Sequence, residues 1–286
     1  MTAEASSIYV NSNNDVYLAG SMLAGSPHYY TATYWKNGKL SFLTDTSNNT
    51  GSDAYSIFID GSDVYISGSI GTFDTEASYW KNGVLNIVGG SNTYANTISV
   101  SDGDVYLGGA TLFSTTNNSF SGENATYWKN GTAVNLTNHN NNIEGIVTSI
   151  FVSGKTIYAA GSTSNLSYGH NIATLWESNN TNILSNSDYD ANVTSIAVAG
   201  NDIYVCGSES KNSALPYLAT YWKNGIEYTL STITSDATSI YIFNGDVYIA
   251  GDIFYTTNVP TAVYWKNGVL VKVGAPNSSV SSIFVK

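Results

Sequence analysis

The chain contains no arginine, one cysteine and four prolines, and charged residues make up only 11% of its 286 positions. The single cysteine, Cys206, excludes a disulfide within the chain. Without arginine, a site that binds a carboxylate or phosphate through bidentate guanidinium hydrogen bonds is disfavoured. Ten lysines stand against 21 acidic residues, so the net charge is −11. No basic stripe exists that would neutralise phosphates, and we expect no nucleic-acid partner.

Long apolar runs are also missing. No stretch is apolar enough to span a bilayer, and Met1 to Ser7 lack the charged and apolar regions of a signal peptide. Asn, Ser, Thr, Gly and Tyr are abundant instead, a mix that is typical of secreted or surface β proteins. We therefore expect no membrane span and an extracellular or cell-surface location.

A repeated pentapeptide is the most informative feature that is present. Five copies read Tyr-Trp-Lys-Asn-Gly, and a sixth, degenerate copy reads Leu175-Trp176-Glu177. Each copy carries one tryptophan, and the chain has six: Trp35, Trp80, Trp128, Trp176, Trp222 and Trp265. They are spaced 45, 48, 48, 46 and 43 residues apart. A fixed period in this range indicates a repeat architecture.

The second repeat shows what one unit contains. Residues 56–59 and 63–68 are rich in β-branched and aromatic residues, and they are separated by an Asp-Gly-Ser turn. Residues 77–80 and 84–88 form another such pair around Asn82-Gly83. Asn-Gly between two strands is the strongest short hairpin signal, because both turn positions need a positive φ. Each repeat is thus predicted to be a four-stranded antiparallel meander with strands a, b, c and d.

Both faces of these strands carry bulky side chains, since the neighbours Tyr79 and Trp80 must point to opposite sides. A sheet that is apolar on both sides needs cover on both sides, which radially stacked blades provide. We therefore predict an all-β fold, a six-bladed β-propeller with about 46 residues per repeat. Residues 1–286 are predicted to form a single domain. A β-solenoid is the alternative, although its coils are usually shorter than this period.

The strand b pattern resembles a kelch-like blade, in which an Ile/Val-Tyr strand ends in small residues and glycine. Examples are Val16-Tyr17-Leu18-Ala19-Gly20 and Val105-Tyr106-Leu107-Gly108-Gly109. The pentapeptide itself is similar to the YWKNG-type repeats of surface proteins from marine and gut bacteria. That resemblance implies an extracellular propeller and assigns no reaction.

The two ends of the chain carry copies of the same strand. Ser7-Ile8-Tyr9-Val10 and Ser282-Ile283-Phe284-Val285 both match strand a, which makes seven copies for six blades. The two terminal copies would compete for one place in a closing blade. We expect the N-terminal copy to be the one inside the ring, and removal of residues 281–286 to cost little stability.

The connections differ in length and in charge. The a–b and c–d turns are short and alike, whereas the b–c and d–a loops are long and differ in every repeat. Function tends to reside on variable loops that a rigid scaffold holds. These variable loops contain one lysine, Lys211, and eleven acidic residues: Asp45, Asp53, Asp74, Glu76, Glu123, Glu144, Asp188, Asp190, Glu209, Asp236 and Asp252. They also contain the three histidines, His28, His139 and His170. We place the function on this face.

The pentapeptide is interpreted as a structural element. The six tryptophans would pack the blades rather than stack on sugars, and the motif lysines would cover the rim with their methylene stems. The motif glycines, which serve the turn, are Gly38, Gly83, Gly131, Gly225 and Gly268. The aspartate that opens strand b, as in Asp63, resembles a calcium ligand, but a short hairpin offers too few oxygens. It is expected to bond to its own turn.

No catalytic motif is recognisable, and Cys206 aligns with small residues in strand b, where it would fill space. Glu209 and Asp252 follow the strand b glycine, where other repeats have Ser or Ala, and are the first candidates for ligand binding. The further candidates are Tyr30, Tyr217, Tyr255 and His170. No catalytic or metal-binding residue is assigned and no cofactor is expected, with calcium as the one ion left open.

These observations favour a non-enzymatic binding or scaffold propeller that engages a protein or carbohydrate ligand through the variable loops. One alternative is a lectin, in which aromatic, Asn and Asp side chains contact a sugar. Another is a glycosidase or lyase that uses carboxylates of the same face, because glycoside hydrolysis needs only two.

Overall fold

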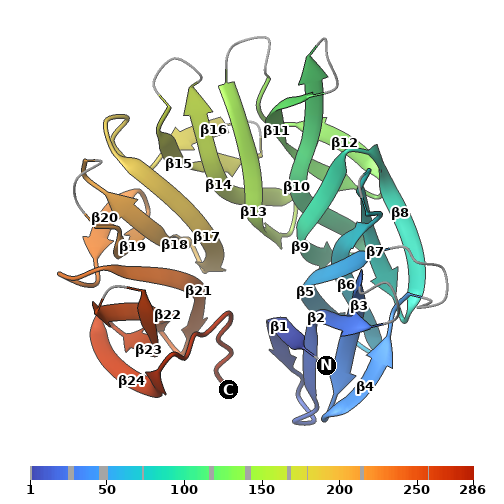
Figure 1. Cartoon of the computed structure of the whole chain (residues 1–286), viewed down its shortest axis with the longest axis horizontal. Helices are drawn as coiled ribbons and strands as arrows, with labels where there is room; N and C mark the ends of the chain where they lie inside the picture. The colour runs from blue at the N-terminus through green and yellow to red at the C-terminus, as the bar shows by residue number, and fades with distance from the viewer. Residues whose placement is uncertain are drawn as a thin grey trace. The chain divides into compact units, whose positions relative to one another are not determined.

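The computed structural model describes residues 2–24, 29–44, 51–72, 74–115, 119–138, 143–165, 169–178, 180–212, 216–256 and 258–286. These residues form strands and turns and contain no helix, so none of them forms a helix that could cross a membrane. They build six four-stranded antiparallel sheets, the blades of a six-bladed β-propeller (Figure 1). In every sheet the strands follow chain order, which is the predicted meander.

The chain divides into two compact units, residues 1–139 and 140–286. The first unit holds three blades. Blade 1 contains β1 (Ala3–Val10), β2 (Val16–Ala24), β3 (Tyr29–Lys36) and β4 (Lys39–Phe42). Blade 2 contains β5 (Ser52–Asp60), β6 (Asp63–Ile70), β7 (Glu76–Lys81) and β8 (Val84–Ser91). Blade 3 contains β9 (Thr93–Ser101), β10 (Asp104–Thr115), β11 (Ser119–Lys129) and β12 (Thr132–Asn135).

The second unit holds the other three blades. Blade 4 contains β13 (Ile143–Ser153), β14 (Thr156–Asn165), β15 (Asn171–Glu177) and β16 (Asn180–Ile183). Blade 5 contains β17 (Asp190–Ala199), β18 (Asp202–Ser210), β19 (Leu218–Lys223) and β20 (Ile226–Thr229). Blade 6 contains β21 (Ser235–Phe243), β22 (Asp246–Thr256), β23 (Val259–Lys266) and β24 (Val269–Pro276). The strands are longer than the sequence pattern predicted.

The N-terminal copy of strand a is β1, which pairs with β2 along its whole length, from Ala3 opposite Met22 to Val10 opposite Val16. The N-terminal copy therefore supplies strand a of blade 1, as expected. The C-terminal copy, residues 282–285, belongs to none of the six sheets.

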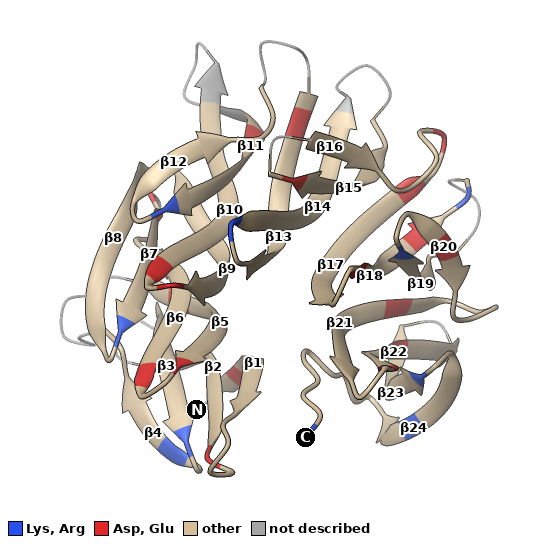
Figure 2. Cartoon of the chain, turned by 180° about the vertical axis from the view of Figure 1, so that it is seen from behind, with Lys and Arg blue, Asp and Glu red and all other residues tan. Residues whose placement is uncertain are grey.

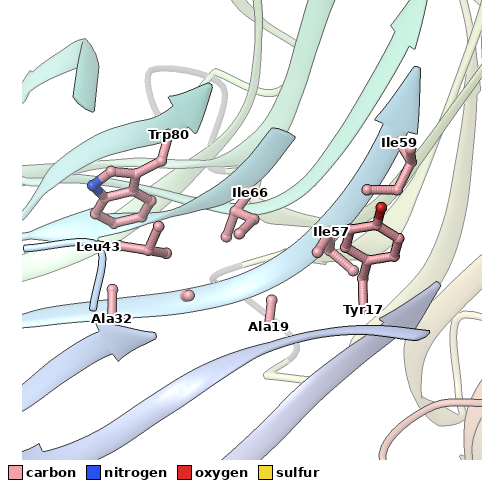
Figure 3. Close-up of a cluster of buried hydrophobic side chains, with 9 residues drawn as sticks. Tyr17, Ala19, Ala32, Leu43, Ile57, Ile59, Ile66 and Trp80 are labelled. Atoms are coloured by element: carbon pink, nitrogen blue, oxygen red, sulfur yellow. The ribbon is translucent and has the colours of Figure 1, made fainter. Parts of the chain in front are cut away.

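Successive blades pack through apolar faces. One cluster joins Tyr17, Ala19 and Ala32 of blade 1 to Ile57 and Trp80 of blade 2 (Figure 3). Trp80 is 0% exposed. Burying an indole of about 150–250 Å² contributes roughly 4–6 kcal/mol as an upper estimate. Trp80, Trp128, Trp222 and Trp265 each lie in such a cluster and hold one blade against its neighbour.

Five of the six motif tryptophans are almost fully buried: Trp80, Trp128, Trp176, Trp222 and Trp265. Trp35 is half-buried. Buried rings offer no open face to a sugar, so these five tryptophans do not serve as stacking platforms.

Every blade has a β-bulge in strand a opposite the strand b glycine, for example between Val193 and Ser195 opposite Gly207. The bulge brings the strand a backbone close to that glycine. A Cβ at Gly207 would overlap the carbonyl oxygen of Asn192. The same overlap occurs at Gly20, Gly68, Gly109, Gly161 and Gly251. The recurring glycine of strand b is therefore required by this close approach of two strands.

Candidate functional site

The pentapeptide ties the c–d turn to strand b of its own blade. In blade 2, Asn82 donates its amide hydrogen to Asp63 at 2.9 Å and accepts one from the backbone of Val64 at 2.9 Å. Lys81 Nζ lies 2.9 Å from the second oxygen of Asp63 and 5.0 Å from the ring centre of Tyr65. Asn82 and then Lys81 lower the pKa of the Asp63 carboxyl. We call this arrangement the turn joint.

Four other blades repeat the turn joint, with the acidic and basic residues on neighbouring strands (Figure 2). The ion pairs are Lys36–Asp15, Lys129–Asp104, Lys223–Asp202 and Lys266–Asp246. In blade 4, Thr156, Glu177 and Ser178 stand in the places of the aspartate, lysine and asparagine.

The turn joint corrects two details of the sequence interpretation. The strand b aspartate bonds to the side chains of the c–d turn, because the meander places that turn beside the start of strand b. The motif lysine lies over a tyrosine ring and is ion-paired, so its charged end has a specific partner. Lysine and asparagine therefore occupy both oxygens of the carboxylate that was compared with a calcium ligand. Among the described residues, no three His, Cys, Asp or Glu side chains gather as a metal site.

A cleft of about 510 Å³ opens where blades 5 and 6 meet at their b–c and d–a ends. Its walls come from the residue before β19, from the start of β21 and the residue before it, and from the end of β22 and the turn that follows. The lining residues are Tyr217, Thr234, Asp236, Phe254, Tyr255, Thr256 and Asn258. We call this the Tyr255 cleft. Two backbone hydrogen bonds of 3.0 Å, Ser235 N–H to Tyr217 O and Phe254 N–H to Thr234 O, hold its walls together.

A second cavity of about 410 Å³ adjoins the cleft and shares Tyr255 with it. Its lining is mostly apolar: Leu230, Ile233, Ile253, Trp265 and Leu270, with Thr229, Ser231 and Thr232. Tyr255 is 56% exposed, and Lys272 Nζ lies 5.9 Å from its ring centre. This tyrosine is the common wall of the polar and the apolar compartment.

Tyr217 is fixed in position by Asp190. The Tyr217 hydroxyl donates a hydrogen bond to Asp190 Oδ2, while Asp190 Oδ1 accepts one from the backbone of Asn171 at 3.0 Å. The hydrogen bond to Asp190 and the burial of the phenol raise the pKa of Tyr217 to about 12. The ring is therefore presented to the cleft in a set orientation, with its hydroxyl already bonded elsewhere.

Two carboxylates of blade 6 lie opposite each other, since Asp236 of β21 pairs with Asp252 of β22. Burial raises the pKa of both. Their settings differ, because Asp236 lines the Tyr255 cleft, whereas Asp252 is 9% exposed and accepts the backbone hydrogen of Val280 at 3.2 Å. Asp252, a sequence candidate, is therefore engaged with the C-terminal segment.

Glu209 does not join Asp252. It lies two positions after Gly207, whereas Asp252 directly follows Gly251, so the two side chains are on opposite faces of their strands. Glu209 is 2% exposed and both its carboxylate oxygens have no hydrogen-bond partner. Burial, and next the charge of Glu227, raise its pKa to about 7. Lys211 Nζ lies 3.3 Å from Glu227 Oε1.

The remaining candidates are dispersed. Tyr30 is 41% exposed on β3 of blade 1, and His170 is half-buried just before β15 of blade 4. The structure thus brings together only Tyr217 and Tyr255 of the six. His28, His139 and Asp45 lie outside the described residues.

The sequence pattern does not identify the other lining residues of the cleft as ligand-binding: Thr234, Asp236, Phe254, Thr256 and Asn258. They lie in β21 and β22 of blade 6 or directly beside these strands, and the packing of blade 5 against blade 6 adds Tyr217 to them. One signal existed in the sequence. Aromatic residues follow strand b at Phe254-Tyr255, beside a d–a loop that contains Asp236.

Comparison with known proteins places the fold without assigning an activity. No family model and no curated protein sequence matches the chain. An acylaminoacyl peptidase from Pyrococcus horikoshii is similar to 96% of the chain at TM-score 0.56 and 15% identity, and the match spans 46% of that protein. TolB from Acinetobacter baumannii is similar to 93% at TM-score 0.53 and 12% identity, spanning 67% of that protein.

A polysaccharide lyase of family PL25, an ulvan lyase, is similar to 95% of the chain at TM-score 0.53 and 10% identity, and the match spans 82% of that lyase. The similar structures thus include enzymes and a protein, TolB, whose name states no reaction. At these identities the likeness shows the fold alone.

Proposed function

We propose that this protein is a non-enzymatic binding propeller that takes a neutral carbohydrate in the Tyr255 cleft. The observation that carries the proposal is the lining of the cleft, in which three aromatic rings surround one carboxylate, two threonines and one asparagine. A sugar offers apolar C–H faces to such rings and hydroxyl groups to such acceptors. A volume of about 510 Å³ lies in the range of small-molecule sites.

The charge of the cleft selects against acidic sugars. Asp236 is the one charged residue among the lining residues, and no lysine lines the cleft. The carboxylate or sulfate of an acidic sugar needs a cationic partner when it leaves water. A neutral saccharide needs none, and its hydroxyl groups donate hydrogen bonds to Asp236.

The arrangement of carboxylates supports binding over catalysis. A glycosidase places two carboxyl groups on either side of the scissile bond. Asp236 is the one carboxylate among the lining residues of the Tyr255 cleft. Its cross-strand neighbour Asp252 is engaged by the backbone of Val280, and Glu209 is buried. We propose that the cleft works without a cofactor and without calcium. Its place of action is proposed to be outside the cell or at the surface.

Isothermal titration calorimetry with saccharides chosen from a glycan array tests the proposal. The Tyr255→Ala variant is expected to bind about tenfold more weakly or worse, because it removes a wall of the cleft. Tyr30→Ala is the matched control, since Tyr30 is a similarly exposed tyrosine of another blade. Equal affinity of wild type and Tyr255→Ala contradicts the proposal, as does an array with acidic glycans as the only hits.

Two further measurements separate the alternatives. Addition of EDTA is expected to leave the affinity unchanged, whereas its loss would show a calcium-dependent lectin. Release of reducing ends from a bound glycan, lost in Asp236→Asn, would establish the glycosidase or lyase alternative instead.

A further inference from the structure

The chain continues past β24 and returns to its own blade. Residues 278–286 form no strand and run beside β21 (Figure 1). Ser278 holds the start of this segment, because its hydroxyl accepts the backbone hydrogen of Ala262 at 3.1 Å. We call residues 280–286 the tail.

Neighbouring blades of the second unit are joined by three recurring hydrogen bonds. The backbone N–H of Val193 in blade 5 donates to Ser162 Oγ of blade 4 at 3.3 Å. Three residues further on, Ile196 N–H donates to Ser149 Oγ at 3.2 Å. The third bond follows the bulge, where Thr194 Oγ1 donates to the carbonyl of Ala237 in blade 6 at 2.8 Å.

The first unit repeats the first two of these bonds between blades 1 and 2. Ala54 N–H donates to Ser21 Oγ and Ile57 N–H donates to Ser7 Oγ, both at 3.3 Å. The aromatic rings of Tyr9 and Phe58, one residue after each isoleucine, lie 6.3 Å apart. Together these contacts mark the place where strand a of one blade packs on strands a and b of the preceding blade.

The tail makes the same contacts with blade 6. Val280 N–H donates to Asp252 Oδ1 at 3.2 Å, and Ile283 N–H donates to Ser239 Oγ at 3.3 Å. Thr238 Oγ1 donates to the carbonyl of Val280 at 2.9 Å. The rings of Phe284 and Tyr241 lie 4.8 Å apart. Residue by residue, the tail occupies the place that strand a of a following blade would take.

The tail differs from every strand a in what supports it from the side. Strand β21 is bonded to β22 from Ser235 to Phe243, whereas no described strand pairs with the tail. Ile240 is 5% exposed, but Ile283, its counterpart in the tail, is only half-buried. The tail therefore makes the inter-blade contacts of a strand a, but it lacks the hydrogen-bonded pairing with a strand b that holds each strand a in its sheet.

We propose that blade 6 carries a docking site for an extended peptide strand of the pattern Ser-Ile-aromatic-Val, which the tail fills as a displaceable internal occupant. The partner is a strand supplied by another polypeptide. It is recognised by its backbone through Asp252, Ser239 and Thr238, and by an aromatic side chain through Tyr241. This site uses the face of blade 6 that the tail covers, and none of its four residues lines the Tyr255 cleft.

Hydrogen exchange of the full chain tests whether the tail is displaceable. The amides of Val280 and Ile283 are expected to exchange at least a hundredfold faster than the ladder amides of β21, because only the β21 amides open together with a sheet. This measurement needs no variant, and exchange of the tail amides as slow as that of the β21 amides would overturn the proposal.

A fluorescent peptide of residues 279–286 tests the docking site by anisotropy. It is expected to bind a chain that ends at residue 279 at least tenfold more tightly than the full chain, because the attached tail competes at a high effective concentration. Equal affinity for both chains, or no saturable binding to a shortened chain with unchanged circular dichroism, overturns the proposal.

A matched pair of variants of the shortened chain locates the bound peptide. Ser239→Ala removes the acceptor for Ile283 and is expected to weaken peptide binding severalfold. Ser149→Ala removes the same acceptor between blades 4 and 5 and is expected to leave the affinity unchanged. Equal effects of the two variants would place the peptide elsewhere and overturn the assignment.

Discussion

At the scale of single residues, the turn joint explains why the pentapeptide recurs. Asn82 has a φ of 50°, a left-handed value that asparagine tolerates better than most residues, and its side chain reaches back to Asp63 and Val64. One residue therefore provides both the backbone shape of the turn and its attachment to strand b.

The free energy of unfolding of the Asn82→Ala variant is expected to be about 1–2 kcal/mol lower than that of the wild type, because the variant loses two hydrogen bonds and strains the turn. Urea denaturation followed by circular dichroism measures this change. Asn82→Gly is the control that relieves the strain while it loses the same bonds, and it should fall between wild type and Asn82→Ala. A loss as large in the glycine variant would assign the whole effect to the hydrogen bonds.

At the same scale, Glu209 makes the stability of the folded chain depend on pH. Its pKa of about 7 in the folded chain lies above the value of 4.5 expected after unfolding, so the folded state binds the proton more tightly. The stability contributed by the protonated carboxyl is complete below about pH 4.5 and is lost as the pH rises through 7. Both carboxylate oxygens of Glu209 are buried without a hydrogen-bond partner, and the charge of Glu227 also disfavours the ionised form.

Glu209→Gln is expected to melt like the wild type at pH 5 and several degrees higher at pH 8, because glutamine stays neutral. Differential scanning fluorimetry over this range measures the difference. Glu227→Gln is the companion variant and should lower the pH at which Glu209 ionises, since it removes a neighbouring negative charge. A constant offset between wild type and Glu209→Gln at both pH values would contradict this account.

At the scale of elements, the strand b glycine and the strand a bulge depend on each other. The bulge lets strand a turn its serine hydroxyl toward the next blade, where it accepts a backbone hydrogen, as Ser149 does from Ile196. The glycine leaves room for the bulged backbone, so the two features must occur together.

Gly207→Ala is expected to cost about 3 kcal/mol or more, because its Cβ would overlap the carbonyl oxygen of Asn192 and force two strands apart. Gly200→Ala is the control, since a Cβ there meets open space and only the positive φ of 62° is unfavourable. That control should cost about 1 kcal/mol. Thermal and urea unfolding of both variants decides, and similar losses would refute the steric argument.

At the scale of the whole molecule, each of the two units has its own apolar clusters. In residues 140–286, one cluster joins blades 4 and 5 through Val205 and Trp222, and another joins blades 5 and 6 through Ile240 and Trp265. Three blades with two shared interfaces resemble a short repeat array, whose stability is the sum of its repeats and the interfaces between neighbours.

Residues 140–286, expressed alone, are therefore expected to keep a β-type circular dichroism spectrum and to unfold cooperatively. Trp222→Ala within this fragment should lower its stability by about 3–5 kcal/mol or prevent folding, because it empties one of the two interfaces. An unfolded fragment would show instead that residues 1–286 act as the single domain predicted from the sequence.

The sequence alone determined the blade and its number of copies. The period of the tryptophans, the Asn-Gly turns and the two-sided bulk of the strands are local signals, and each of them specifies a hairpin or a buried face without reference to distant residues. For the same reason the sequence placed Trp80 and Cys206 in packing roles, and both are fully buried.

Tertiary structure alone decided where a ligand site can form. Glu209 and Asp252 look equivalent in the sequence, yet a shift of one residue along strand b sends them to opposite faces, one buried and one bonded to Val280. Tyr217 and Tyr255 become neighbours only because blade 5 packs against blade 6. Repeats encode what lies within a blade, whereas a cleft between blades depends on side chains that are far apart in the chain.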